Sequence, residues 1–309
     1  MKRIIISAII ALLMPMSLIG QTTSSLWKKY ESAMDKDHPK DAMTVLHAIA
    51  DKSMTEKEWG HLIKAEFSMM SLQSSLTPDS IQPMIDEMAE KAKSAENVDP
   101  VLAAVYNTCL GKYYSEVETF YLSPKEKAAN EQKAKESFAK ALENPKMLAD
   151  TKARHYEPLL VQGDGSLTFG NDLLHVIAFE AKEYNMASKW YEDHGNRPAA
   201  CLAAFYQTQK DRYEDVRETR KSKYMATLDS LIHVYRDLPE AGEIAIEHFN
   251  FMDQALDASS QEKVEYIDYA LRTWPTWPRM VVLRNARSRI TRPSFHVLLP
   301  ETTVIPGKE

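Results

Sequence analysis

The chain has 309 residues, of which 44% are hydrophobic and 27% charged, a composition typical of folded globular proteins and not of disordered chains. It contains only 9 glycines, while alanine, lysine, glutamate, leucine and methionine are abundant, as expected for a protein made mostly of helices. The formal net charge of -6 gives no general attraction to phosphate backbones, so nucleic acid is not an expected partner.

The first twenty residues have the pattern of a secretory signal peptide. Lys2 and Arg3 precede an apolar run, residues 4–13, which is too short to span a bilayer stably. We therefore expect cleavage after Gly20 and export to the periplasm, the outer membrane or the cell surface, with no transmembrane span after signal removal. The alternative is a buried N-terminal helix. Because Gln21 stands where a bacterial lipoprotein would carry its cysteine, a lipid anchor is not expected.

The helices are marked by their start signals. Capping boxes are predicted at Thr55–Glu58 and Ser259–Glu262, because a hydroxyl and a carboxylate three residues apart can satisfy two unpaired backbone donors of the first turn. Ser123 followed by Pro124 marks another start. These signals and the 3.6-residue apolar period predict helices near 24–35, 39–53, 55–75, 78–96, 100–122, 124–143, 147–159, 171–193, 196–209, 214–236, 239–256, 260–273 and 277–290.

Helices of this length joined by short turns suggest antiparallel pairs. One segment, AKESFAKALENP, resembles the second half of a tetratricopeptide unit through Ala134, Phe138, Ala141, Leu142 and Pro145. Residues 264–275 are a weaker match, and no strict repeat links the two. The sequence thus predicts an all-α, tetratricopeptide-like solenoid with helical repeats over 21–162 and 173–290. The glycine-rich segment 163–172 separates them, as a hinge or simply as a loop.

Catalytic motifs are missing from the sequence. It has no HExxH, CxxC or GxSxG pattern, and its nine histidines are scattered. Asp164 and Asp172 lie in the glycine-rich segment, but the spacing of an EF-hand calcium loop is lacking, so an ordinary loop is the better interpretation. We expect no enzymatic activity, no cofactor and no metal site. Cys109 and Cys201 both lie in apolar helical segments, where a small buried hydrophobe is commoner than a disulfide.

The aromatic residues cluster in pairs, and Trp190, Tyr191, Trp274 and Trp277 are candidate interaction residues. The concave face of a solenoid can use such rings to bind an extended peptide, although packing between helices is their commoner use.

The end of the chain has a different period. Phe295, Val297 and Leu299 alternate with their neighbours as in a β-strand, so they are candidates for strand pairing. A strand needs a neighbouring sheet, which either a following β domain or a partner protein would supply. Pro306 and Gly307 form a turn signal close to the last residue, Glu309, which favours truncation there. Residues 291–309 would then be the start of a truncated β domain.

Three segments together resemble the N-terminal part of large bacterial alpha-2-macroglobulin-family proteins: SLWKKYESAMDKDHPKDAMTVLHAIADKS, WYEDHGNRPAACLAAFY and RTWPTWPRMVVLRNARSRITRPSFHVLLPETTVIPGKE. The most specific part is the junction 274–307, where the helices meet a strand similar to the first of a macroglobulin-type β-sandwich. The resemblance implies downstream β domains as partners in the same polypeptide, and a docking or spacing role in envelope protease inhibition, with proteases or envelope proteins as further partners.

The thioester motif that some members of this family carry is absent around both Cys109 and Cys201. If the full-length protein has a thioester, it would lie beyond Glu309. The alternative function is a tetratricopeptide-like nutrient-binding protein or adaptor of the outer membrane, which would bind glycans through a Trp/Tyr platform.

Overall fold

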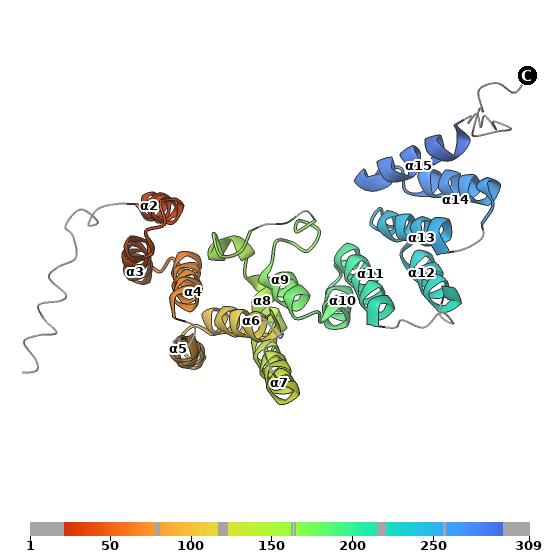
Figure 1. Cartoon of the computed structure of the whole chain (residues 1–309). Coiled ribbons are helices and arrows are strands. Elements are labelled where there is room, and N and C mark those ends of the chain that lie inside the picture. The colour runs from red at the N-terminus through yellow and green to blue at the C-terminus, as the bar shows by residue number, and fades with distance from the viewer. Residues whose placement is uncertain are drawn as a thin grey trace, which may run out of the picture. The chain divides into compact units, whose positions relative to one another are not determined.

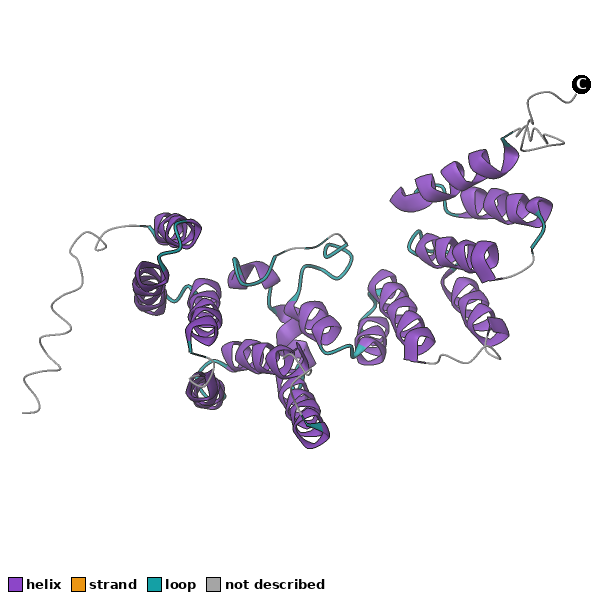
Figure 2. Ribbon diagram, viewed as in Figure 1, coloured by secondary structure: helices purple, strands orange, loops and turns teal. Residues whose placement is uncertain are grey.

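A computed structural model describes residues 22–77, 81–116, 123–161, 163, 165–214, 221–255 and 258–292. Within these ranges the regular structure is helical and no strand is present (Figure 2), so the predicted all-α class is confirmed for the described residues. The signal-peptide residues and the strand candidates Phe295, Val297 and Leu299 lie outside these ranges.

The chain divides into two compact units, Met1–Trp190 and Tyr191–Glu309, called here the N-terminal and C-terminal units. The boundary falls within one helix, α10 (Tyr184–Asp193). The helices of the N-terminal unit before α10 are shown in red to green in Figure 1: α2 (Thr23–Asp35), α3 (Pro39–Glu56), α4 (Trp59–Leu76), α5 (Ile81–Ala95), α6 (Pro100–Glu116), α7 (Pro124–Ala141), α8 (Pro145–Asp150), the 3-10 helix η3 (Ala153–Tyr156) and α9 (Leu173–Glu180).

The C-terminal unit is also made of helices. Its helices are α11 (Arg197–Glu214), α12 (Lys221–Tyr235), α13 (Ala241–Ala255), α14 (Ser260–Thr273), the 3-10 helix η5 (Pro278–Met280) and α15 (Val281–Thr291). One hydrophobic core runs through this unit, with Phe249, Trp274 and Leu283 among its buried members.

Within each unit, helices pack mainly against their neighbours in sequence: α2 on α3, α5 on α6 and α6 on α7 in one unit, α11 on α12 and α14 on α15 in the other. This is the contact pattern of a helical repeat protein. Helix α6 also contacts α9, and its run from Leu102 to Thr108 is buried. A helix that is apolar on all sides is expected where neighbours cover every face, so α6 is the centre of its unit.

The tetratricopeptide-like segment packs as its residue types predict. Ala134 and Ala141 are buried on one face of α7, and Phe138 between them lies against Gly111 of α6. A Cβ added at Gly111 would come within 2.9 Å of the Phe138 ring. The glycine therefore allows the aromatic ring to fill the space between the two helices.

Two predicted helix starts are confirmed and one is wrong. Ser123 and Ser259 each accept the backbone N–H three residues on, and the glutamate there accepts in return, which completes both capping boxes. Thr55 instead lies inside α3, where its hydroxyl donates to the Asp51 carbonyl over 2.9 Å. The helix ends at Glu56 because Lys57 adopts the left-handed conformation, with φ 58°.

Two longer predicted helices are broken in the structure. The helix expected over 147–159 is the short α8 followed by η3. The helix expected over 171–193 is interrupted between α9 and α10, where Lys182 has φ 57° and the Glu183 N–H bonds back to the Ala178 carbonyl. Helices commonly end at a residue in the left-handed conformation with this hydrogen bond. Glycine is the usual residue there, so a lysine at this position does not predict the end of the helix.

The glycine-rich segment belongs to the N-terminal unit and does not mark the division of the chain. Asn171 accepts the Ala153 N–H over 2.9 Å, and the Leu173 N–H donates to the Thr151 carbonyl over 2.9 Å, which ties the segment to η3. Phe169 is buried and stacks on His175 with ring centroids 4.7 Å apart. These contacts hold the segment within the N-terminal unit.

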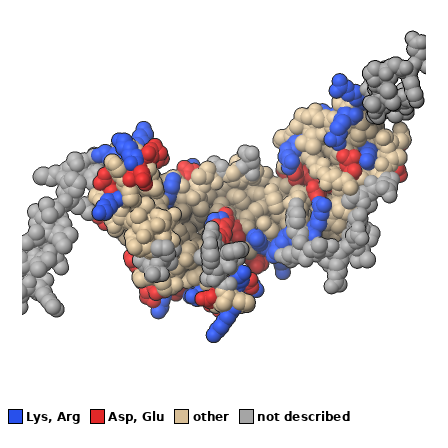
Figure 3. Space-filling model, viewed as in Figure 1, with Lys and Arg blue, Asp and Glu red and all other residues tan. Residues whose placement is uncertain are grey.

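Charged residues of both signs lie in groups on the surface of the helices (Figure 3). On the face shown in Figure 3, lysine and arginine mix with aspartate and glutamate over α2 and α3. Pairs at helical spacing, such as Lys52 with Glu56 and Lys146 with Asp150, belong to this solvated surface and contribute little to stability.

Candidate functional site

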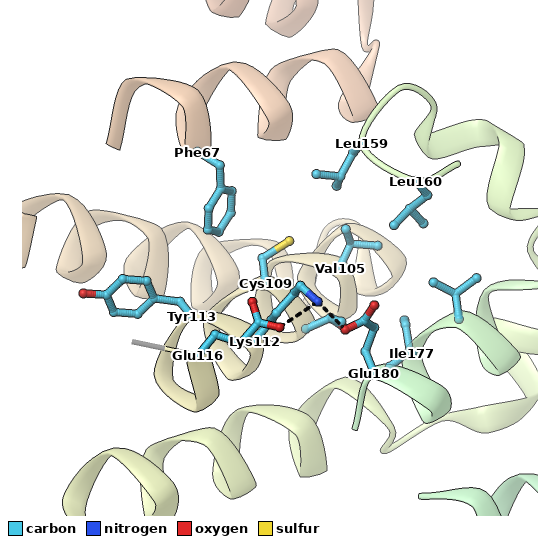
Figure 4. Close-up of a pocket in the computed structure, with 12 residues that line it drawn as sticks. Phe67, Val105, Cys109, Lys112, Tyr113, Glu116, Leu159, Leu160, Ile177 and Glu180 are labelled. Carbon is cyan, nitrogen blue, oxygen red and sulfur yellow. Dashed lines mark hydrogen bonds and ion pairs between the residues drawn. The ribbon is translucent and has the colours of Figure 1, made fainter. Parts of the chain in front are cut away.

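An apolar cavity of about 510 Å³ lies inside the N-terminal unit. Helix α6 supplies one wall with side chains three and four residues apart, which therefore share a face. Phe67 of α4 closes one side, and residues 159 and 160 of the segment after η3 close another (Figure 4). The lining residues are Phe67, Val105, Thr108, Cys109, Lys112, Tyr113, Glu116, Leu159, Leu160, Val176, Ile177 and Glu180.

The wall helices are held together by a buried polar cluster beside the cavity. Glu66, next to Phe67 in the chain, is 6% exposed. Its carboxylate accepts hydrogen bonds from the Tyr106 hydroxyl over 2.8 Å and from Lys91 Nζ over 2.6 Å. One carboxylate thus joins α4, α5 and α6, and it fixes the stretch of α4 from which Phe67 enters the cavity.

The charged part of the lining is a group of three residues at one side of the cavity. Lys112 Nζ lies 2.7 Å from Glu180 Oε2 and 3.1 Å from Glu116 Oε1, and Figure 4 shows it between the two carboxylates. All three side chains are 41% to 64% exposed, so they face both the cavity and solvent. The hydrogen bond to Glu180 is the main reason that the pKa of Lys112 is raised.

Cys109 places its sulfur on the cavity wall (Figure 4). Burial, with a smaller contribution from the Glu180 charge, raises the pKa of its thiol to about 12. The thiol is therefore protonated at neutral pH, and a protonated thiol is a poor nucleophile and a poor metal ligand. Cys109 acts as part of the apolar lining. Both Cys109 and Cys201 are free, so the structure contains no disulfide between them.

A second hollow, of about 610 Å³, adjoins the charged group on its other side. It lies among α6, α7 and α9, and Glu116 and Glu180 line it as well. Phe138 and Phe179 contribute its aromatic surface. The two carboxylates therefore face two neighbouring hollows.

The aromatic candidates of the sequence analysis lie elsewhere. Tyr191 and Trp274 are buried, at 3% and 2% exposure, and the Trp274 indole donates to the Arg236 carbonyl over 3.0 Å. Trp277 is half-buried and donates to Glu243 Oε2 over 3.0 Å. Trp190 is half-buried and belongs to the N-terminal unit, whereas the other three belong to the C-terminal unit.

Asp172, considered with Asp164 as a calcium candidate, has a structural role. Its carboxylate accepts the His175 N–H over 2.9 Å and so caps α9. Asp164 lies outside the described residues. Among the residues that the structure describes, no group of three or more His, Cys, Asp or Glu side chains is placed to hold a metal ion.

The cavity was not predicted from the sequence. Its walls come from four separate segments, and the bonded residues Lys112 and Glu180 alone are 68 residues apart, so no local spacing reveals the cavity. Only the pair of Lys112 and Glu116, four residues apart on one helix, was visible as a pattern, and such pairs are common on solvated helix surfaces.

Comparisons of the chain with protein families, with curated proteins and with solved structures give no match. None of the described helices combines the length and the apolar composition needed to cross a membrane.

Proposed function

We propose that this chain is a non-catalytic helical module of an exported alpha-2-macroglobulin-like protein, in which it docks or spaces the β domains that follow it. In this proposal the helices form a tetratricopeptide-like solenoid, and the protein works in the cell envelope as part of a protease inhibitor. Downstream β domains of the same polypeptide are its first partners, and proteases or envelope proteins are further ones.

The observation that carries the proposal is the packing of helices on their sequence neighbours within each unit. Repeats of this kind form extended surfaces, which are commonly used for binding other proteins. The Gly111–Phe138 contact supports the tetratricopeptide-like description, because a small residue opposite an aromatic ring sets the approach of the two helices.

The junction on which the family resemblance depends begins within an ordered core. Trp274 is buried in the C-terminal unit, and α15 (Val281–Thr291) packs on α14 immediately before residues 293–309. A β domain beginning there would continue from a helix that is fixed in its own unit. This arrangement suits a spacing element, since a rigid end transmits position to the next domain.

We do not favour glycan binding through a Trp/Tyr platform. Such a platform needs aromatic faces open to solvent, whereas Tyr191 and Trp274 are buried and their rings are used in packing. Trp277 keeps part of its surface exposed, but its indole N–H is bonded to Glu243.

Export is tested by expressing the full chain in a Gram-negative host and sequencing the N-terminus of the protein from the periplasmic fraction. The proposal expects a mature chain that begins at Gln21. A variant with Ile4→Asp and Ile9→Asp, which breaks the apolar run, should stay in the cytoplasm uncleaved. Recovery of the unmodified chain from the cytoplasm, with Met1 or Lys2 at its N-terminus, would remove the basis for an envelope role.

A further inference from the structure

The cavity of the N-terminal unit has the size and lining of a small-ligand site. Its volume of about 510 Å³ lies within the range of roughly 300–1,000 Å³ that is usual for such sites. Most of its lining is aliphatic or aromatic, and the protonated thiol of Cys109 adds a further apolar surface. The cavity therefore favours a ligand with an apolar body.

The uncharged polar groups in the lining are poorly placed to form hydrogen bonds with such a ligand. The Thr108 hydroxyl already donates to the Ala104 carbonyl over 2.8 Å. The Tyr113 ring lies at the edge of the cavity, and its hydroxyl points away from the cavity centre in Figure 4. Polar recognition must then come from the charged group of Lys112, Glu116 and Glu180.

Within the lining of this cavity the charged group has one negative charge in excess, because two carboxylates share a single ammonium, whereas Lys127, Lys135 and Lys182 line the neighbouring hollow. Lys112 Nζ pairs with both glutamates, 2.7 Å from Glu180 Oε2 and 3.1 Å from Glu116 Oε1. Each carboxylate has about four lone-pair sites, so both retain acceptor capacity after the contact with Lys112. A second ammonium group placed beside them would be attracted, and a carboxylate or phosphate would be repelled.

We propose that this cavity binds a hydrophobic primary amine. The apolar body lies among Phe67, Val105 and Leu160, and the ammonium group donates to Glu180 and Glu116 at the exposed side of the cavity. Charge complementarity at this rim gives the selectivity, and apolar burial gives most of the affinity. This site is independent of the proposed role as a macroglobulin-type module.

The test uses three probes of matched shape: 4-phenylbutylamine, 4-phenylbutan-1-ol and 4-phenylbutyrate. Their dissociation constants for the full chain are measured by calorimetry at neutral pH and low salt. We expect the amine to bind about fivefold or more tightly than the alcohol, and the butyrate to bind more weakly than both. Equal binding of the three probes, tighter binding of the butyrate, or no binding of the amine overturns the proposal.

The variant Glu180→Gln locates the site. It should weaken binding of the amine by about fivefold and leave binding of the alcohol unchanged, because only the charged probe loses an ion pair. Glu143→Gln, an exposed residue on no wall of the cavity, is the matched control and should change neither constant. Circular dichroism checks that both variants remain folded. An unchanged amine constant in folded Glu180→Gln contradicts the assignment.

Cys109 supplies a reporter within the cavity. Because the protonated thiol reacts slowly, alkylation by iodoacetamide is followed by peptide mass spectrometry during long incubation at about pH 9. Saturating 4-phenylbutylamine should slow alkylation of Cys109 at least about twofold, since the probe covers the sulfur. Cys201, at 0% exposure, reports any general opening of the fold. Slower alkylation of Cys109 with unchanged Cys201 supports the site, and unchanged alkylation of Cys109 in the presence of bound amine places the amine elsewhere.

Discussion

The Tyr106 hydroxyl donates a hydrogen bond to Glu66 Oε2 over 2.8 Å, and the carboxylate that accepts it is 6% exposed. Burial and the neighbouring Glu66 charge raise the pKa of Tyr106, so the phenol stays protonated and remains a donor at neutral pH. Together with Lys91, this donor satisfies a carboxylate that would otherwise be buried without enough partners.

Tyr106→Phe removes this donor and should destabilise the N-terminal unit. Because Glu66 then keeps only Lys91 as a side-chain partner among the described residues, we expect a loss of about 1–3 kcal/mol in the free energy of unfolding, measured by urea denaturation. Tyr113→Phe is the control, since the Tyr113 hydroxyl makes no hydrogen bond within the described part of the chain, and it should cost less than about 0.5 kcal/mol. Equal losses in the two variants would show that the buried bond is unimportant.

Gly60 is required by a close backbone contact. A Cβ at this position would lie 2.4 Å from the backbone of Tyr156 and Glu157, which cannot move aside as a flexible side chain can. Gly60→Ala should therefore destabilise by about 1–3 kcal/mol, even though alanine is the better helix former by about 1 kcal/mol. Gly163→Ala is the control, because nothing lies within 4 Å of its added Cβ. A Gly60→Ala protein as stable as wild type would contradict this contact of α4 with η3.

The capping box at the start of α14 stabilises the C-terminal unit. Ser259 Oγ accepts the Glu262 N–H, and Glu262 accepts from the Ser259 N–H over 2.8 Å. Ser259→Ala should cost about 1 kcal/mol, visible as a lower thermal midpoint. The adjacent Ser260→Ala, at the first helical position, should change the midpoint little. If the Ser260 variant were the less stable of the two, the helix would begin at a different residue.

His248 should make the stability of the C-terminal unit depend on pH. Its ring is 8% exposed, stacks on Tyr266 and bonds to Asp229 Oδ1 over 3.0 Å. Burial lowers its pKa from the ordinary value of 6.5, although the Asp229 charge opposes the shift. The unfolded chain therefore binds a proton more readily, so the stability from neutral His248 is complete above pH 6.5 and declines as the pH falls below it.

This dependence is measured as the free energy of unfolding between pH 8 and pH 5 for wild type and His248→Gln. The variant cannot titrate at this position, so its stability should fall less steeply over the acid part of the range. Subtracting the two curves removes the contribution of the carboxylates common to both proteins. A variant curve as steep as that of wild type, or steeper, would contradict the lowered pKa.

Local sequence signals predicted the helical class well because they are satisfied within one helix. Ser123 and Ser259 find their capping partners three residues away, so the pattern and the structure agree. The Thr55–Glu58 pattern failed because tertiary contacts compete with it: Glu58 accepts the Thr23 hydroxyl of α2 over 2.8 Å. A local motif does not reveal a partner 35 residues away.

The cavity depends even more on distant contacts. Phe67, Cys109 and Ile177 come from three helices, and each alone has the character of an ordinary core residue. The clustering of the aromatic residues predicted candidate binding residues, but Tyr191 and Trp274 are buried in the hydrophobic core. Residue type therefore indicated which side chains bury apolar surface, while the position of a remaining hollow depends on how all the helices meet.

The central proposal is that this chain is the helical part of a longer exported protein with β domains. The most direct measurement is to read the coding sequence past the codon for Glu309. The account predicts an open reading frame that continues into repeated β-sandwich patterns of about 100 residues each, the first of them beginning with a strand that would contain Phe295, Val297 and Leu299. A stop codon directly after Glu309 would contradict the account, and the chain would then be better explained as a helical adaptor.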